Sequence, residues 1–195
     1  MNYPLDFSFK ILAIAPQIAV TDANGGLVLY VKQKAFKLKE DVTVFADEAQ
    51  SRPMYRITAD RIIDFNARYD IRSSAGEPLG GIKRQGMRSF WKSHYDVSDA
   101  RGATAFSIRE ANPWTKVFDS LLGEVPVIGM LTGYAFHPAY IVTRPNGTPM
   151  FRVTKRPALF EGKYRVTVEG KYTEADEALA LPAMIMMLLL ERMRG

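Results

Sequence analysis

Basic side chains that follow similar turns are the residues of this 195-residue chain best suited to chemistry. They form three groups: Lys32 and Lys34; Lys83, Arg84, Arg88 and Lys92; and Arg152, Lys155 and Arg156. Ammonium and guanidinium groups bind phosphate and carboxylate anions, and Phe90 and Trp91 could contact a lipid headgroup or stack on a base. The pattern predicts an anion-binding site on related strands. The alternative is a set of solvated strand faces whose lysines discourage aggregation.

Candidates for catalysis or metal binding are few. Cysteine is absent, which excludes disulfides, thiolate zinc sites and S-palmitoylation. The two histidines, His94 and His137, are 43 positions apart, and we interpret both as packed or turn residues. Gly80, Gly81 and Gly86 lack the strand-to-helix context of a phosphate loop and indicate a bulge or a close backbone approach. We therefore predict a non-enzymatic protein without metal or cofactor.

Charge and composition narrow the class of partner. The formal net charge is +5 and the pI is about 9.4, which favours an acidic membrane surface or nucleic acid. We expect lipid headgroups rather than nucleic acid. The absence of cysteine suits a reducing compartment, so we expect a cytoplasmic protein, peripheral to the inner face of the membrane. The segment from Met1 to Lys10 lacks a basic leader and predicts a first strand, not a signal peptide.

A local pattern around four glycines predicts repeated β-hairpins. It occurs at residues 20–25, 71–76, 97–102 and 142–147, each time with Val or Ile first and Gly last. Another β-branched residue follows six positions after each glycine: Val31, Ile82, Ile108 and Val153. The composition between them is typical of a type I turn closed by a left-handed glycine.

Alternating polarity places one face of each strand in a core. Residues 63–72 and 164–169 alternate between apolar and polar side chains, with Tyr164, Val166 and Val168 expected on the buried face. The alternation changes phase between residues 31–34 and 36–39, which predicts a bulge or break near Ala35.

The segment from Ala178 to Leu190 is apolar on every face and predicts a helix buried on all sides. Its thirteen residues would span roughly 20 Å, against about 30 Å for the hydrocarbon core of a bilayer, so we expect no transmembrane insertion. Thr173 and Asp176 form a capping box before it, and Pro182 is expected to kink or loosen it. A second, short helix is predicted from Pro113 to Leu122, with Asn112 as its cap.

Repeated hairpins that end in an apolar carboxy-terminal helix make the chain similar to the LURP-one-related family and, more distantly, to phospholipid scramblase and tubby carboxy-terminal domains. The similarity runs from the hairpin at Val20 to Met193. It implies a mainly β fold: a closed antiparallel barrel of about twelve strands around a buried central helix, as one domain over residues 1–195. Scramblases are associated with an acidic calcium-binding segment before this helix, but residues 161–172 here alternate as a strand and lack a run of oxygen ligands.

Together these observations predict a binding module that contacts phosphoinositide or another acidic membrane lipid through its basic strand residues. The alternative is a structural or regulatory domain that works by protein contact, with the apolar segment from Val125 to Phe136 as its surface.

Overall fold

The computed structural model describes residues 1–10, 17–32, 41–61, 67–85, 93–111, 139–157 and 161–192. Several predictions fall outside these ranges: the helix at 113–122, the apolar segment at 125–136, the break near Ala35 and the place of His137. They stay predictions.

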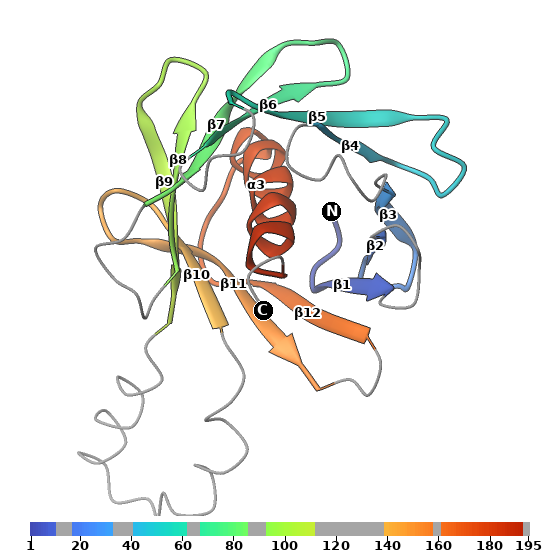
Figure 1. Cartoon of the computed structure of the whole chain (residues 1–195). Helices are drawn as coiled ribbons and strands as arrows, with labels where there is room; N and C mark the ends of the chain where they lie inside the picture. Colours follow the sequence, from blue (N-terminus) through green and yellow to red (C-terminus); the bar gives the residue numbers. More distant parts are fainter. Residues whose placement is uncertain are drawn as a thin grey trace, which may run out of the picture.

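Within the described ranges, twelve strands form a closed antiparallel barrel around one helix (Figure 1). Each strand pairs with its neighbours in sequence, and β1 pairs with β12 to close the barrel. The predicted fold class is therefore confirmed. The elements are β1 (Leu5–Lys10), β2 (Gln17–Thr21), β3 (Leu27–Lys32), β4 (Asp41–Phe45), β5 (Pro53–Ala59), β6 (Arg68–Ser73), β7 (Pro78–Arg84), β8 (His94–Asp99), β9 (Thr104–Glu110), β10 (Ala139–Thr143), β11 (Pro149–Arg156), β12 (Glu161–Val168) and α3 (Glu174–Arg192).

The four predicted hairpins are confirmed as β2–β3, β6–β7, β8–β9 and β10–β11. Their turn glycines, Gly25, Gly76, Gly102 and Gly147, have φ between 79° and 86°, a conformation that glycine adopts without steric cost. The register shifts by one residue just before each turn, after Val20, Ile71, Val97 and Val142. This shared bulge explains why one sequence pattern recurs four times.

A fifth hairpin, β4–β5, escaped the sequence pattern because its loop is longer. Gln50 takes the left-handed position with φ 59°, where the other turns have glycine. The loop is held instead by the Asp47 carboxylate, which accepts hydrogen bonds from the backbone N–H groups of Ser51 (3.0 Å) and Arg52 (2.9 Å). These bonds also lower the pKa of Asp47 below its usual value.

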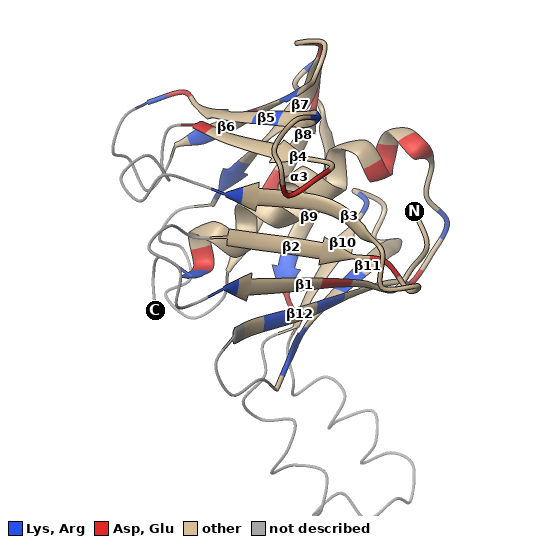
Figure 2. Ribbon diagram, turned by 90° about the vertical axis from the view of Figure 1, so that its right-hand side faces the viewer, with Lys and Arg blue, Asp and Glu red and all other residues tan. Residues whose placement is uncertain are grey.

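The up-and-down order of the strands gives the barrel two different ends. The turn end carries the five hairpin turns and the start of α3. The distal end is where the odd-numbered strands and α3 finish. The two ends can be compared in Figure 2, which views the barrel from the side.

The helix α3 fills the centre of the barrel, as predicted. Every residue from Leu179 to Leu189 is buried, at 6% exposure or less for the apolar ones, so this stretch has no wet face. Pro182 lies inside it and is buried. The prediction that Val168 is buried was wrong: it is the last residue of β12 and is 40% exposed, and Val166 is the last buried residue of that strand. Within the described residues, no helix is both long and apolar enough to cross a membrane.

Gly80 allows α3 to approach the wall. A Cβ atom at this position would lie 2.1 Å from the backbone oxygen of Ser98 and 3.0 Å from Cδ1 of Leu179 in the helix. The close backbone approach predicted for this glycine is therefore confirmed. On other strands the interior is filled by large aromatic side chains: Phe7, Phe9, Phe106 and Phe151.

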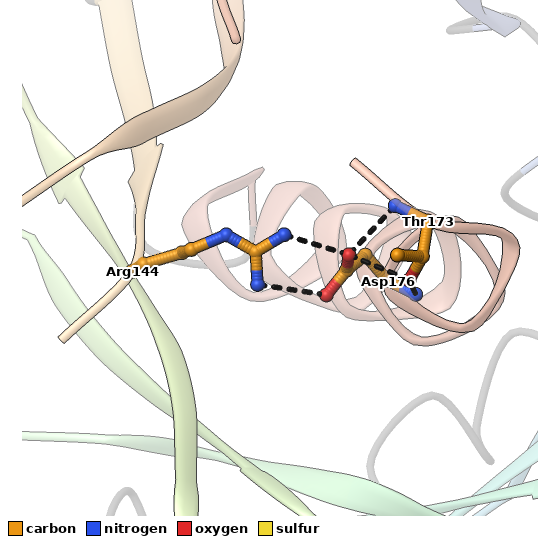
Figure 3. A network of polar contacts seen from close by, with 3 residues as sticks. All are labelled: Arg144, Thr173 and Asp176. Carbon is orange, nitrogen blue, oxygen red and sulfur yellow. Dashed lines mark hydrogen bonds and ion pairs between the residues drawn. The ribbon is translucent and has the colours of Figure 1, made fainter. Parts of the chain in front are cut away.

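The first turn of α3 is tied to the β10–β11 hairpin (Figure 3). Thr173 and Asp176 form the predicted capping box: the Thr173 N–H donates to Oδ2 of Asp176 (2.7 Å), and the Asp176 N–H donates to Oγ1 of Thr173 (3.2 Å). The Arg144 guanidinium donates two further bonds to the same carboxylate, at 3.2 and 2.8 Å. Burial opposes ionisation of Asp176, but these hydrogen bonds outweigh it and hold its pKa below the usual value.

Replacing Asp176 with Ala is expected to lower the free energy of unfolding by about 2 kcal/mol at pH 7, because hydrogen bonds to charged groups contribute about 1.5–3 kcal/mol. A lowered folded-state pKa means that this contribution is present above the unfolded value of about 3.9 and is lost as the pH falls through the folded pKa. Urea denaturation at pH 7 and pH 3 should therefore show a smaller effect at pH 3. Glu174→Ala, an exposed change in the same turn, is the control. Equal effects at both pH values would contradict this account.

Candidate functional site

Odd-numbered strands finish at the distal end, and most of them finish on basic residues. Lys10 ends β1, Lys32 ends β3, Lys83 and Arg84 end β7, Arg109 is next to last in β9, and Lys155 and Arg156 end β11. Lys163, near the start of β12, joins them. We call the exposed members of this ring the basic rim: Lys10, Lys32, Lys83, Arg109, Arg156 and Lys163.

The basic residues predicted from sequence have different positions relative to this rim. Three belong to it: Lys32, Lys83 and Arg156. Three lie outside the described residues: Lys34, Arg88 and Lys92. Arg84 and Lys155 lie on the inner side of the wall, because each is two positions after a buried residue, Ile82 or Val153, and such positions share one face of a strand. Arg152 lies on the outer face of β11, away from its end, and forms an ion pair with Glu169. The structure thus places the described members around the barrel and not in one pocket.

The rim is densest where the barrel closes. Arg156 on β11 lies directly opposite Lys163 on β12, and Lys163 lies opposite Ser8 on β1. Lys10 pairs with Gln17 on β2, and Gln17 pairs with Lys32 on β3. Neighbouring strands are about 4.8 Å apart, so these cations cross five adjacent strands within roughly 20 Å. We call Arg156, Lys163, Lys10 and Lys32 the basic arc; in Figure 2, blue segments mark the ends of β1 and β3 and part of β12.

The carboxylate of Asp6, near the arc, is already engaged by another cation. Asp6 accepts two hydrogen bonds from the Arg165 guanidinium, at 2.8 and 2.7 Å. Its pKa is lowered, first by this bond and then by the charges of Arg165, Arg156 and Lys163, while partial burial opposes the shift. The pairing also places Glu161 opposite Lys10. Among the described residues, Lys10, Lys32 and Arg156 have no carboxylate oxygen within 4.0 Å.

On the inner side of the distal end, polar side chains face the end of α3 and not the solvent outside the barrel. Tyr95 is fully buried, and its hydroxyl donates a short hydrogen bond to the Glu191 carboxylate near the end of α3. Burial raises the pKa of Tyr95, and the Glu191 charge raises it further, so the phenol keeps its proton. The Nε atom of Arg84 is buried and makes no hydrogen bond. Arg192 lies over the ring of Phe9, 5.3 Å from its centre. These groups position the helix end, whereas the rim cations point outward.

His94 is the first residue of β8 and lies on its outer face, half-buried among side chains and not in the core. Outward-facing positions alternate with the buried Tyr95 and Val97, which explains its place. Its Nε2 atom is 3.3 Å from Nε of Arg109 and 3.0 Å from Oδ1 of Asp96. The described residues contain no group of three His, Asp or Glu side chains that could hold a metal ion.

Sequence reasoning missed four cations near the rim: Lys10, Arg109, Lys163 and Arg165. The sequence search looked for basic residues that follow the turn glycines. Three of the four missed residues lie in β1 and β12, and neither strand follows such a turn. The sequence did contain a signal for two of them: Lys163 and Arg165 flank Tyr164, an alternation that places both cations on the outer face of one strand.

Comparison with known proteins agrees with the fold. The chain is similar to an X-ray structure of a protein from Arabidopsis thaliana, with a TM-score of 0.54 and 15% sequence identity, over 100% of this chain and 94% of that chain. A porin-like protein from Bacteroides uniformis aligns with 85% of this chain and 96% of its own, but a TM-score of 0.24 and 9% identity are too low to carry an argument. No curated protein matches the sequence. The family model described as LURP-one-related matches residues 27–188, most of the barrel and nearly all of its central helix, and the chain therefore belongs to the LURP-one-related family.

Proposed function

We propose that this barrel is a non-enzymatic binding module that attaches to acidic phospholipid headgroups, phosphoinositides included, at a membrane surface through the basic arc. The observation that carries the proposal is a set of four cations within five adjacent strands, on all of them except β2. Three of these cations, Lys10, Lys32 and Arg156, have no carboxylate partner among the described residues.

Like charges within the arc support an anionic ligand. Arg156 and Lys163 are direct cross-strand neighbours, and like charges in this position destabilise a sheet. A phosphate group bound between them would add charge-assisted interactions with both cations. The nearby carboxylate of Asp6 does not remove the excess of positive charge, because Arg165 already binds it.

Exposure also suits a membrane surface. All four residues of the arc are exposed, so their side chains can reach a flat layer of headgroups without a change in the barrel. Each Lys or Arg held near an acidic bilayer contributes about 1 kcal/mol to binding.

Neutralising two residues of the arc tests the proposal. Lys10→Gln combined with Arg156→Gln is expected to cost about 2 kcal/mol, or roughly thirtyfold in affinity, for vesicles of phosphatidylcholine with phosphatidylserine or a phosphoinositide. Vesicle sedimentation measures the affinity. The matched control is Arg101→Gln with Lys171→Gln, which removes the same charge from exposed residues at the turn end and should leave binding within twofold.

Two outcomes would overturn the proposal. One is equal binding of the parent protein to pure phosphatidylcholine vesicles, which would remove the role of charge. The other is an equal loss in the arc variant and in the control, which would reduce the effect to net charge. The protein-contact alternative depends on residues 125–136, which lie outside the described residues.

A further inference from the structure

We infer that the barrel docks end-on, with its distal end against the acidic membrane and its turn end pointing away from the lipid. This orientation rests on the proposed function and adds which surface of the fold meets the bilayer. The alternative orientation is lateral, with the barrel lying on the wall that carries the basic arc.

The first argument is that the basic rim continues around the barrel beyond the arc. Lys83 on β7 and Arg109 on β9 are exposed near the distal ends of strands beyond the arc: β7 lies opposite β1, and β9 lies two strands beyond β11. Strand β7 is four strands away from both β3 and β11 around the closed sheet. A flat anionic surface can face cations on both sides of the barrel only if it meets the end of the barrel.

Carboxylates of the rim region are less available than its cations. Asp96 lies within 3.0 Å of His94 and also accepts a hydrogen bond from Gln85. Glu110 is half-buried, and Glu191 is bonded to the buried Tyr95. Among the described residues, the distal end therefore presents exposed positive charge, while much of its negative charge is turned inward or engaged.

The turn end has the opposite charge balance. Its connections, together with the last residue of β8 and the first turn of α3, cover residues 22–26, 46–52, 74–77, 99–103, 144–148 and 169–177 and contain nine carboxylates and four side-chain cations. The carboxylates are Asp22, Asp47, Glu48, Glu77, Asp99, Glu169, Glu174, Asp176 and Glu177. Many of them serve the local structure as turn and helix caps, as Asp22, Asp99 and Asp176 do. An acidic bilayer would repel this end and attract the other, which orients the barrel axis along the membrane normal.

The two orientations differ in how much Lys83 and Arg109 contribute. A twelve-stranded barrel is roughly 20 Å across. In lateral docking, β7 would lie about that far from the lipid, more than two Debye lengths at physiological ionic strength, and β9 would lie between it and the arc. The charge of Lys83 would then be screened. In end-on docking, these cations touch the headgroup layer as the arc does.

Lys83→Gln with Arg109→Gln therefore tests the orientation. End-on docking predicts a loss of affinity of about thirtyfold for phosphatidylserine vesicles, equal to that of the arc pair. Lateral docking predicts affinity within twofold of the parent. The turn-end pair, Arg101→Gln with Lys171→Gln, is again the control for net charge.

Single cysteines give a second measurement, because the chain has none of its own. Gln85→Cys and Ala75→Cys place a fluorescent label just beyond the two ends of β7, both at exposed positions. With a headgroup-attached quencher in phosphatidylserine vesicles, end-on docking predicts strong quenching at residue 85 and little at residue 75.

The outcomes separate this inference from the proposed function. Binding that depends on the arc, with no loss in the Lys83 and Arg109 variant and equal quenching at both labels, would overturn end-on docking alone. Failure of the parent protein to prefer acidic vesicles would overturn the proposed function, and the orientation with it.

Discussion

Lysine introduced at each position from Ala183 to Leu189 in turn is expected to prevent folding or strongly destabilise the barrel at every position. All seven residues are at most 2% exposed, so no direction around α3 offers the ammonium group a route to water. Burial of an unpaired charge costs several kcal/mol, a large part of the 5–15 kcal/mol that stabilises a typical domain. A lysine that does stay buried avoids part of this cost by losing its proton, with a pKa far below its usual value.

The informative result is that tolerance of lysine does not vary with the period of the helix. An ordinary surface helix tolerates charge once per turn, at positions three or four residues apart, because one of its faces is wet. Thermal denaturation followed by circular dichroism, together with the yield of folded protein, measures tolerance at each position. Ala175→Lys, at an exposed position in the same helix, is the control and should fold normally.

A smaller change, from a large apolar side chain to alanine, gives a measurable free energy of unfolding where lysine variants do not fold. Ile185→Ala should lower the free energy of unfolding by about 2–5 kcal/mol, as expected for a large-to-small change in a well-packed core. Lysine tolerated at two or more positions one turn apart, or an Ile185→Ala cost below about 1 kcal/mol, would contradict the enclosed helix.

Gly80→Ala is expected to destabilise the barrel by roughly 2–6 kcal/mol, an unusual cost for one methyl group. The first reason is steric, since the new Cβ would lie 2.1 Å from the Ser98 backbone oxygen and 3.0 Å from Leu179. Overpacking of this kind costs about 1–3 kcal/mol. The second reason is conformational: Gly80 has φ of 155°, where an L-residue is strained by another 1–3 kcal/mol.

Gly76→Ala is the matched control for this substitution, four residues earlier in the same hairpin. It also replaces a glycine of positive φ, 84°, but a Cβ there would have no atom within 4 Å. Only the conformational cost of about 1–2 kcal/mol applies. Urea denaturation of both variants should rank Gly80→Ala as clearly the less stable. Equal costs would show that the contact between β7, Ser98 and α3 is not tight.

The topology of the barrel also explains how charge is sorted between its ends. Short turns at one end require Asp, Ser or Asn side chains that accept hydrogen bonds from their own backbone, as Asp22 and Asp99 do. These residues add negative charge at the turn end. Strands leaving that end finish at the other, and several of them finish on lysine or arginine. Opposite charge at the two ends therefore follows in part from the needs of the turns.

Local features of the sequence were sufficient to predict four of the five hairpins and the central helix. A left-handed glycine and a bulge require particular residues within six positions, so the hairpins at Gly25, Gly76, Gly102 and Gly147 could be identified without tertiary information. The helix from Leu179 to Leu189 could be placed inside the barrel because an apolar surface on all sides has no stable arrangement in water. The β4–β5 hairpin could not be predicted in this way, because its left-handed position is occupied by Gln50 and not by glycine.

The arrangement of the basic residues was decided only by closure of the barrel. Asp6 and Arg165 are 159 positions apart, yet the pairing of β1 with β12 brings them into a bidentate ion pair. The same pairing places Lys10 beside the strand that carries Lys163, and it leaves Lys83 on the other side of the barrel. Periodicity along one strand determines which way a side chain faces, but not which strand lies next to it. That neighbour is set by the register and closure that bury the whole core around α3, a cooperative property of all twelve strands.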